Sequence, residues 1–383
     1  FSCVGSLVIA ACLRNDGIQS DLIKNGNETS IDITQYEVLH ENAINVYREL
    51  GVWDELKRSA HPLEEMMLHL APKKDKPMAK ILARVPFVVD EYTTLAYSVS
   101  TQKLKQATKN AVLGRRITKI EAKKDSCMVS FKGGAVKQYS TVVMADGTLN
   151  DWLHLFKKRR PAEFRHELAS VVIERDEFDP NSLIELFQFG KRIVIMPISD
   201  TKLQVTFHYM REDIPSSPLG NLQPLRNLIN TCELETAAET VSSIQSILQR
   251  IVALPRTKKI YFTNPRFFYS SIPCYHEGKI LLYPCRRESI DSCGIMHSYQ
   301  IEECYRLSKA IALNSTPESI AKAFVNDSAK KEAQVKKFCS KIIYSSVYQK
   351  YLSYALVYFT AILKHSVFGR YKSRYRAVTA PRK

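Results

Sequence analysis

The stretch from Gly278 to Leu307 (GKILLYPCRRESIDSCGIMHSYQIEECYRL) constrains the fold more than any other part of the 383-residue chain. Ile280–Tyr283 is apolar and typical of a buried strand, and a turn rich in polar and small residues follows it. A helix is predicted to begin near Gly294, because Ile301 and Leu307 then form an apolar stripe beside the charged pair Glu302-Glu303. A buried strand that leads into a helix is the repeating unit of α/β folds.

Length and composition place the chain among globular proteins. Its residues are 45% hydrophobic and 25% charged, which predicts a large core in one bipartite domain or two closely joined ones. A formal net charge of +16 indicates a polyanionic partner: RNA, an anionic membrane surface or an acidic protein surface. The longest apolar run, Tyr351–Leu363, is too short for a transmembrane segment, because a spanning helix needs about 20 residues.

The nine cysteines are scattered and form no close pair, which argues against a disulfide framework and against a zinc module. We therefore expect reduced thiols, an intracellular location and no metal site. The chain begins at Phe1 rather than Met, and either a cleaved mitochondrial or other organellar presequence or a disordered start would explain this.

The chain before residue 160 is predicted to alternate helices with strands. Leu7–Leu13 is a predicted helix that ends at Gly17, and Ser20–Ile23 begins a strand. The further helices are predicted at Ile33–Leu56 and Tyr97–Ala111, and the further strands at Ala79–Val89, Arg115–Ala122, Met128–Phe131 and Tyr139–Met144.

The apolar period changes to two from Arg165 to Tyr209, which is typical of strands with one buried face. Four strands are predicted there, at Leu168–Glu174, Ser182–Phe189, Arg192–Ile198 and Lys202–Tyr209. We expect them to form an antiparallel sheet, separate from a mostly parallel sheet built from Phe1–Asn25, Ile117–Met144 and Ile280–Tyr283. After Leu307 the chain is predicted to be helical, with a helix start at Ser315-Thr316-Pro317-Glu318.

The order of these elements resembles that of the class A FAD-dependent monooxygenases, the superfamily of the aromatic hydroxylases and squalene epoxidases. Ala145-Asp146-Gly147 resembles the Ala-Asp-Gly motif of that family, and Gly294 stands at the entry to the helix of its second flavin-contacting motif. The resemblance makes Asp146, Gly147 and Gly294 remnants of a cofactor site. Asp-Gly after a strand is also a favourable turn, so both interpretations of this pair stay open.

The resemblance implies an α/β fold: a Rossmann-like parallel sheet for FAD and NAD(P), a second, antiparallel domain of the substrate type, and a helical C-terminal region. The strands at 168–209 look most like those of the squalene epoxidase branch. The domain bounds predicted on this basis are 1–160 for the first part of the FAD-binding-like domain, 161–273 for the antiparallel domain, 274–313 for the second part of the FAD-binding-like domain, 314–363 for the C-terminal helices and 364–383 for a basic tail.

Other positions at which that family contacts flavin carry different residues in this chain. The fingerprint glycines would fall on Phe1, Cys3 and Ser6, or in a shorter register only Gly5 would survive of them. The acidic ribose ligand would fall on Lys24, the flavin-facing Arg on Thr101, and the Gly-Asp pair on Pro284-Cys285.

We therefore interpret the chain as a degenerate member: a non-catalytic pseudoenzyme, with no catalytic residue and no cofactor. It would act as a structural or adaptor subunit of a larger assembly, such as a ribonucleoprotein. The alternative is an active FAD/NAD(P)H-dependent monooxygenase, an epoxidase of the squalene epoxidase type.

Two basic segments are predicted to bind the partner. The first is Lys157-Lys158-Arg159-Arg160. The second lies in the tail, where Arg370, Lys372, Arg374 and Arg376 alternate with the aromatic residues Phe368, Tyr371 and Tyr375. Such alternation combines cations that neutralise phosphates with rings that stack on bases or pack on protein.

Overall fold

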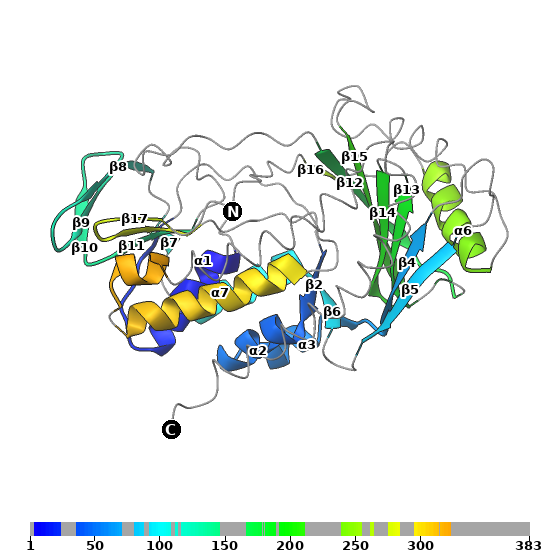
Figure 1. Ribbon diagram of the computed structural model, residues 1–383, viewed down its shortest axis with the longest axis horizontal. Coiled ribbons are helices and arrows are strands. Elements are labelled where there is room, and N and C mark those ends of the chain that lie inside the picture. Colours follow the sequence, from blue (N-terminus) through cyan, green and yellow to red (C-terminus); the bar gives the residue numbers. More distant parts are fainter. Residues whose placement is uncertain are drawn as a thin grey trace.

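The computed structural model describes residues 4–23, 36–70, 80–87, 92–108, 112–113, 116–145, 166–177, 179, 181–188, 191–210, 239–254, 261–263, 275–283, 295–313 and 315–322. These residues form an elongated molecule with a large sheet at one end, a smaller sheet at the other, and a group of helices between them (Figure 1).

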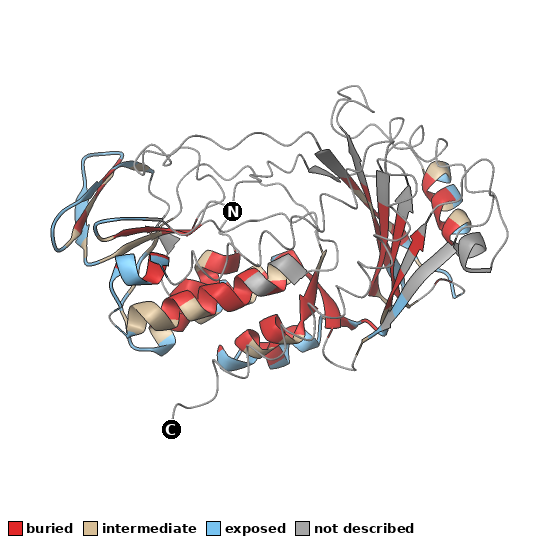
Figure 2. Cartoon of the chain, viewed as in Figure 1, coloured by how far each residue is buried: buried red, intermediate tan, exposed pale blue. Residues whose placement is uncertain are grey.

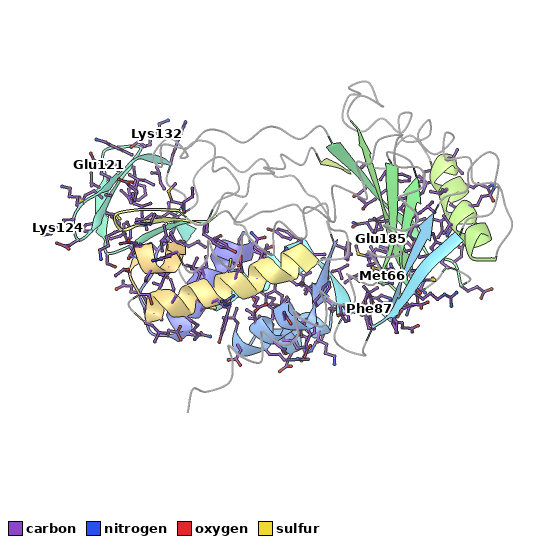
Figure 3. All side chains as sticks on the ribbon, in the orientation of Figure 1. Met66, Phe87, Glu121, Lys124, Lys132 and Glu185 are labelled. Carbon is purple, nitrogen blue, oxygen red and sulfur yellow. The ribbon has the colours of Figure 1, made fainter. Side chains whose placement is uncertain are left out.

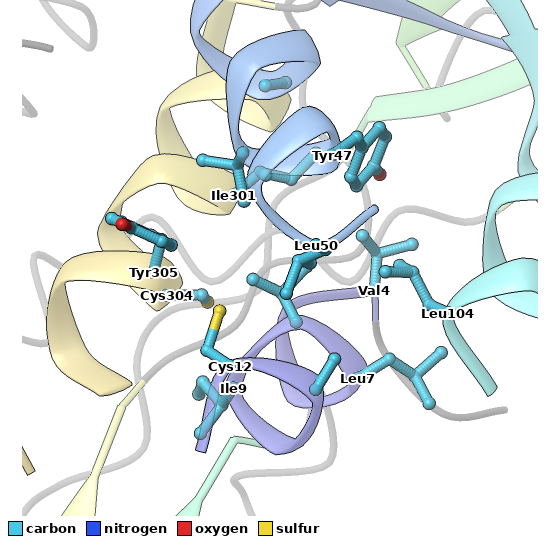
Figure 4. Close-up of a cluster of buried hydrophobic side chains, with 14 of the residues drawn as sticks. Val4, Leu7, Ile9, Cys12, Tyr47, Leu50, Leu104, Ile301, Cys304 and Tyr305 are labelled. Atoms are coloured by element: carbon cyan, nitrogen blue, oxygen red, sulfur yellow. The ribbon is translucent and has the colours of Figure 1, made fainter. Parts of the chain in front are cut away.

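The longest helices of the central group are α1 (Val4–Asn15), α2 (Glu41–Glu49), α4 (Tyr97–Thr108) and α7 (Ile295–Ala312). Helix α1 is buried along almost its whole length, because its sequence VGSLVIAACL offers apolar or small side chains in every direction. Leu7, Tyr47, Leu104 and Ile301 come from the four different helices and meet in one apolar cluster (Figure 4). This cluster holds the helices together.

The predicted parallel pairing is present beside these helices. Strand β11 (Val142–Met144) pairs in parallel with β18 (Ile280–Leu282), and β1 (Leu22–Ile23) pairs in parallel with β7 (Val112–Leu113). Strand β17 (Tyr275–Glu277) adds to β18 in the antiparallel sense. The strand expected at Ile280–Tyr283 and its parallel partner before Ala145 are therefore confirmed.

The strands between residues 117 and 139 pair differently from what the sequence predicted. Strands β8 (Ile117–Ala122), β9 (Cys127–Phe131) and β10 (Val136–Tyr139) form a three-stranded antiparallel sheet of their own. Its assignment to the mostly parallel sheet was wrong, because the short loops that join these strands allow only antiparallel neighbours.

The large sheet has seven strands in the order β16-β12-β15-β14-β13-β4-β5. The four predicted strands are confirmed as β12 (His166–Glu174), β13 (Leu183–Gln188), β14 (Lys191–Ser199) and β15 (Lys202–Met210). The sheet also contains β16 (Tyr261–Thr263), β4 (Glu65–Leu70) and β5 (Lys80–Pro86), and β4 runs parallel to β13. It is therefore not built from residues 168–209 alone.

Each face of the large sheet carries an apolar cluster. Helix α6 (Glu239–Ala253) packs Ile244 and Ile247 on one face, against residues such as Ile184 and Phe207. The other face carries an apolar cluster that faces β2 (Tyr36–His40) and β6 (Tyr92–Ala96) (Figure 2). The members of this cluster are Val38, Leu63, Met66, Tyr92, Leu183, Val194, Met196 and Ile198.

The prediction of one helix over Ile33–Leu56 was wrong for the first part of that range. Residues Tyr36–His40 form β2, which pairs antiparallel with β6. Strand β3 (His61–Pro62) pairs with the same β6, whereas the later residues form α2 and α3 (Trp53–Lys57) as helices. Pairing with a distant strand thus overrides the local helical pattern.

The chain after α7 is described to residue 322. Residues 317–322 are helical, as predicted from the Ser315-Thr316-Pro317-Glu318 start, and the remainder of the predicted C-terminal helices lies outside the described residues. No helix in the described part is long and apolar enough to cross a membrane. The division into domains at residues 160, 273, 313 and 363 stays a prediction.

Candidate functional site

Helices α1 and α7 lie side by side and run in the same direction. At their N-terminal ends, the backbone N–H of Val4 donates to the Tyr97 hydroxyl (3.2 Å), and the Tyr97 ring centre lies 6.5 Å from that of His297. Near their C-terminal ends, Lys309 Nζ donates to Asp16 Oδ1 (2.5 Å). The positive ends of two helix dipoles therefore meet beside Tyr97, and such a place favours an anion.

A buried polar cluster lies at this meeting point. His297 Nε2, in the first turn of α7, is 2.7 Å from Glu37 Oε2 on β2, and the two side chains are only 14% and 8% exposed. The Ser100 hydroxyl of α4 donates to Glu37 Oε1 (2.8 Å). One carboxylate oxygen thus accepts a hydrogen bond from Ser100, and the other lies close to the His297 ring without a hydrogen bond.

Tyr47 of α2 reaches the same cluster from the apolar core. Its side chain is completely buried, and burial raises the pKa of its hydroxyl well above the usual value. The nearby Glu37 and Tyr97 add to that shift, whereas Ser100 opposes it. Tyr47 therefore remains a neutral phenol at physiological pH.

Three further hydrogen bonds attach α7 to its surroundings. The backbone N–H of His40 donates to Ser298 Oγ (3.0 Å), and Asn42 Nδ2 donates to Glu302 Oε2 (3.0 Å). The Tyr283 hydroxyl, at the end of β18, donates to Glu303 Oε2 (2.8 Å). The acidic pair read from the sequence as a charged stripe is thus buried, and both carboxylates accept hydrogen bonds from neighbouring elements.

The residues predicted from motifs lie outside the described part of the chain. This holds for the cofactor-site remnants and for both basic segments, which are Asp146, Gly147, Gly294, Lys157, Lys158, Arg159, Arg160, Arg370, Lys372, Arg374 and Arg376. Their roles stay predictions. Thr101, at the position of the family's flavin-facing Arg, is described: its hydroxyl donates to the Tyr97 and Ser98 carbonyls of its own helix.

The residues of the polar cluster were missed by sequence reasoning. Glu37, Tyr97, Ser100 and His297 come from β2, α4 and α7 and form no local motif. One signal was available: Glu37 is an acid inside the short, largely apolar stretch YEVLH, where a buried carboxylate needs a partner. Among the described residues, no group of three or more His, Cys, Asp or Glu is arranged to hold a metal ion.

Sequence comparison identifies no relatives: no family model matches the chain, and no curated protein matches it. Solved structures, in contrast, match it over nearly its whole length. HpxO from Klebsiella pneumoniae, complexed with FAD and uric acid, has a TM-score of 0.68 at 16% identity, covering 93% of this chain and 90% of that one.

Two other matches belong to the same class of enzyme. PqsL from Pseudomonas aeruginosa, described as a probable FAD-dependent monooxygenase, has a TM-score of 0.68 at 14% identity, covering 89% of this chain and 94% of that one. The 2,6-dihydroxypyridine-3-hydroxylase from Arthrobacter nicotinovorans has a TM-score of 0.64 at 12% identity, covering 89% and 90%. This chain therefore has the fold of the FAD-dependent monooxygenases, as its sequence predicted.

The interpretation of the chain as a cofactor-free pseudoenzyme and structural subunit was wrong. The structures that it matches are FAD-dependent monooxygenases, two of them HpxO with FAD bound, and nothing supports an adaptor role in a ribonucleoprotein. The prediction treated the replaced motif side chains as proof that no cofactor could bind. Helix N-termini hold anions through backbone N–H groups, which any residue except proline supplies.

The described residues fit FAD at the meeting point of α1 and α7. The cofactor carries an anionic diphosphate, and both helices direct the positive ends of their dipoles to this place. The Glu37 carboxylate lies at the same place, with His297 Nε2 at 2.7 Å from its Oε2. This fit rests on backbone groups, and not on the fingerprint glycines.

Proposed function

We propose that this protein is an FAD-dependent monooxygenase that uses NAD(P)H. In the overall reaction, one atom of O2 enters an organic substrate and the other leaves as water, with two electrons supplied by the nicotinamide. The observation that carries the proposal is the convergence of the α1 and α7 N-termini at Tyr97, in a chain whose fold matches such enzymes over about nine-tenths of its length.

FAD, when bound, supplies the redox chemistry and the activation of oxygen, and the protein supplies binding, orientation and electrostatics. The first-turn amides of α1 and α7 would hold the anionic parts of the cofactor. Glu37 and Ser100 would keep His297 in place at the start of α7, and Tyr47 would stay protonated behind them.

The large sheet would provide the wall on which the substrate lies. Two of the hydrogen bonds that join it to the central group lie here: Gln204 Oε1 accepts from the Tyr36 backbone N–H (3.2 Å), and the Thr94 hydroxyl donates to the Pro197 carbonyl (2.9 Å). Next to this contact, on the face opposite α6, Ser170 and Thr206 share a hydrogen bond of 2.9 Å. Hydroxyl groups at this position could orient a polar ring substituent.

The matched enzymes favour a small planar substrate over a long polyene such as squalene. HpxO was solved with uric acid, PqsL with 2-aminobenzoylacetate, and a third match is a dihydroxypyridine hydroxylase. We therefore propose an aromatic or heterocyclic ring compound as the substrate class for this chain.

The test is to titrate the purified protein with FAD and to measure NAD(P)H oxidation and oxygen consumption in its presence. A Ser6→Asp variant puts a carboxylate in the first turn of α1, where it favours the helix but repels a diphosphate. We expect this variant to weaken FAD binding about tenfold or more. The matched control is Ser319→Asp, an exposed first-turn position of the helix at 317–322, which should bind FAD normally.

A protein that takes up no FAD over a wide concentration range would contradict the proposal. Equal loss of affinity in the Ser6→Asp and Ser319→Asp variants would show that flavin binds somewhere other than at α1.

A further inference from the structure

The three-stranded sheet β8–β10 projects from the end of the molecule opposite the large sheet (Figure 1). Residues 116–137 of this sheet contain six Lys or Arg and only two acids. The sheet uses one face for packing, through Ile120, Cys127, Val129 and Phe131. Its other face and its connecting loops are open to solvent.

The cations of this sheet fall into a paired and an unpaired group. Lys119 pairs with Glu121 (2.6 Å), and Lys137 pairs with Asp21 (3.1 Å). The unpaired group is exposed and forms no ion pair with any residue that the structure describes; its members are Arg116, Lys123, Lys124 and Lys132. Figure 3 shows Lys124 and Lys132 at the outer edge of the sheet, on the side away from the helices.

An exposed apolar side chain lies at the end of the sheet that carries Arg116 and Lys132, whereas Lys123 and Lys124 lie in the β8–β9 turn at the other end. Val136 is 52% exposed. Among the described residues, Leu313 is the only other large hydrophobic residue that is exposed. In register, Val136 lies opposite Ser130, which in turn lies opposite Lys119, so all three belong to the outer face. Val136 thus lies within a basic surface and not among apolar neighbours.

The β9–β10 turn next to Val136 is unobstructed. Gly133 and Gly134 have φ values of 98° and 85°, which disfavour residues with a side chain, and a Cβ on either would meet nothing within 4 Å. The hairpin tip therefore stands free of the rest of the described molecule. It can approach a flat surface without any rearrangement.

We propose that the β8–β10 sheet docks on an anionic lipid membrane surface. The four unpaired cations would lie against the headgroups, and Val136 would enter the boundary between headgroups and acyl chains. Each Lys or Arg held near an anionic membrane strengthens binding about fivefold, and the effects of the four residues multiply. One apolar side chain at the tip adds a contribution that does not depend on salt.

A membrane explains this surface better than a nucleic acid does. Single-stranded nucleic acids are bound by cations together with aromatic side chains on which the bases stack. The outer face of the sheet offers Lys119, Glu121, Met128, Ser130, Val136 and Gln138, and none of these is aromatic. An exposed valine has no role in phosphate binding, whereas it suits a lipid surface.

The experiment measures co-sedimentation of the full chain with phosphatidylcholine vesicles that contain or lack phosphatidylserine. It needs no flavin, so its outcome is independent of the proposed enzymatic function. We expect binding to the phosphatidylserine vesicles that weakens with added salt, and much weaker binding to phosphatidylcholine alone. The double variant Lys124→Gln/Lys132→Gln should weaken binding about 25-fold.

Two further variants make the test specific to this surface. Lys105→Gln/Lys202→Gln removes two exposed lysines of α4 and β15 with the same change in net charge, and it should bind nearly as well as the parent. Val136→Ser leaves the charge unchanged and should weaken binding about fivefold.

Equal binding to both kinds of vesicle, or an equal loss in the two lysine variants, would overturn the proposal. Tighter binding to a single-stranded RNA oligonucleotide, unaffected by Val136→Ser, would assign the surface to nucleic acid instead.

Discussion

His297 Nε2 lies 2.7 Å from Glu37 Oε2, and this contact joins the first turn of α7 to strand β2. The two residues are separated by most of the chain, yet both side chains are nearly excluded from water. The pair therefore fixes the start of α7 relative to β2, at the place where we propose that FAD binds.

The first prediction concerns that pair. His297→Ala should lower the free energy of unfolding by about 3 kcal/mol, because it leaves a buried carboxylate with only Ser100 as a partner. The double variant Glu37→Gln/His297→Ala should recover part of this loss, since it removes the unpaired charge. Urea denaturation measures both effects, and His276→Ala, at an exposed position, is the control. A fully additive double variant would show that the pair contributes no interaction energy.

The second prediction concerns the contact between α6 and the large sheet. Arg250 Nη2 lies 2.7 Å from Asp179 Oδ1 and 2.6 Å from Oδ2, and its Nη1 donates to the Glu174 carbonyl. Asp179 is only 4% exposed, so Arg250→Ala should destabilise the protein by about 3 kcal/mol. Arg58→Ala, at an exposed position of the central group, should cost less than about 0.5 kcal/mol. Thermal unfolding compares the two, and similar midpoints would contradict the prediction.

The third prediction is a dependence of stability on pH. His69 of β4 is completely buried, and burial, assisted by the charge of Arg84, lowers its pKa from 6.5 to about 4. Between these two values the unfolded chain binds a proton that the folded chain does not, so stability falls as the pH falls. At pH 4.5 the loss from this residue should be about 2–3 kcal/mol relative to pH 7.

His69→Leu should remove that part of the pH dependence, whereas His276→Leu, at an exposed position, should retain it. Free energies of unfolding measured at several pH values between 4.5 and 7 provide the test. An unchanged slope in the His69→Leu variant would show that another group is responsible.

The fourth prediction concerns the core between the helices. Leu7 is completely buried in the cluster of α1, α2, α4 and α7, so Leu7→Ala should destabilise the protein by about 2–5 kcal/mol. The matched control is Leu313→Ala at the end of α7, where the side chain is 80% exposed and the expected change is within about 0.5 kcal/mol. Chemical denaturation should separate the two leucines clearly, and equal effects would contradict the packing described for α1.

Some elements could be predicted because their patterns are local. The alternation in residues 168–209 follows directly from a strand's two faces, and the apolar run at Ile280–Tyr283 matches a fully buried parallel strand. The helix at Tyr97–Thr108 was predicted to within three residues of its end. In each case neighbouring residues alone carry the signal.

Other features depend on contacts between distant residues and were missed. Nothing in Glu65–Leu70 indicates that it pairs with β13, because a strand's edge partner leaves no mark in its own sequence. The buried state of Glu302 and Glu303 depends on Asn42 and Tyr283, which lie far away in the chain. Charged residues on a helix are expected to be exposed to solvent. Only the positions of Asn42 and Tyr283 explain why these two are buried.

The sequence by itself determined the strands at 168–209, the buried strand at Ile280–Tyr283 and several of the helices, and thereby the fold class. Only the tertiary structure decided that α1 and α7 place their N-termini together beside Tyr97, and that Glu37 meets His297 there. Periodicity reports which face of an element is buried, whereas a site depends on which buried faces meet. The backbone groups at the ends of α1 and α7 are the same for almost any residue, so the motif residues alone did not reveal that the two N-termini meet.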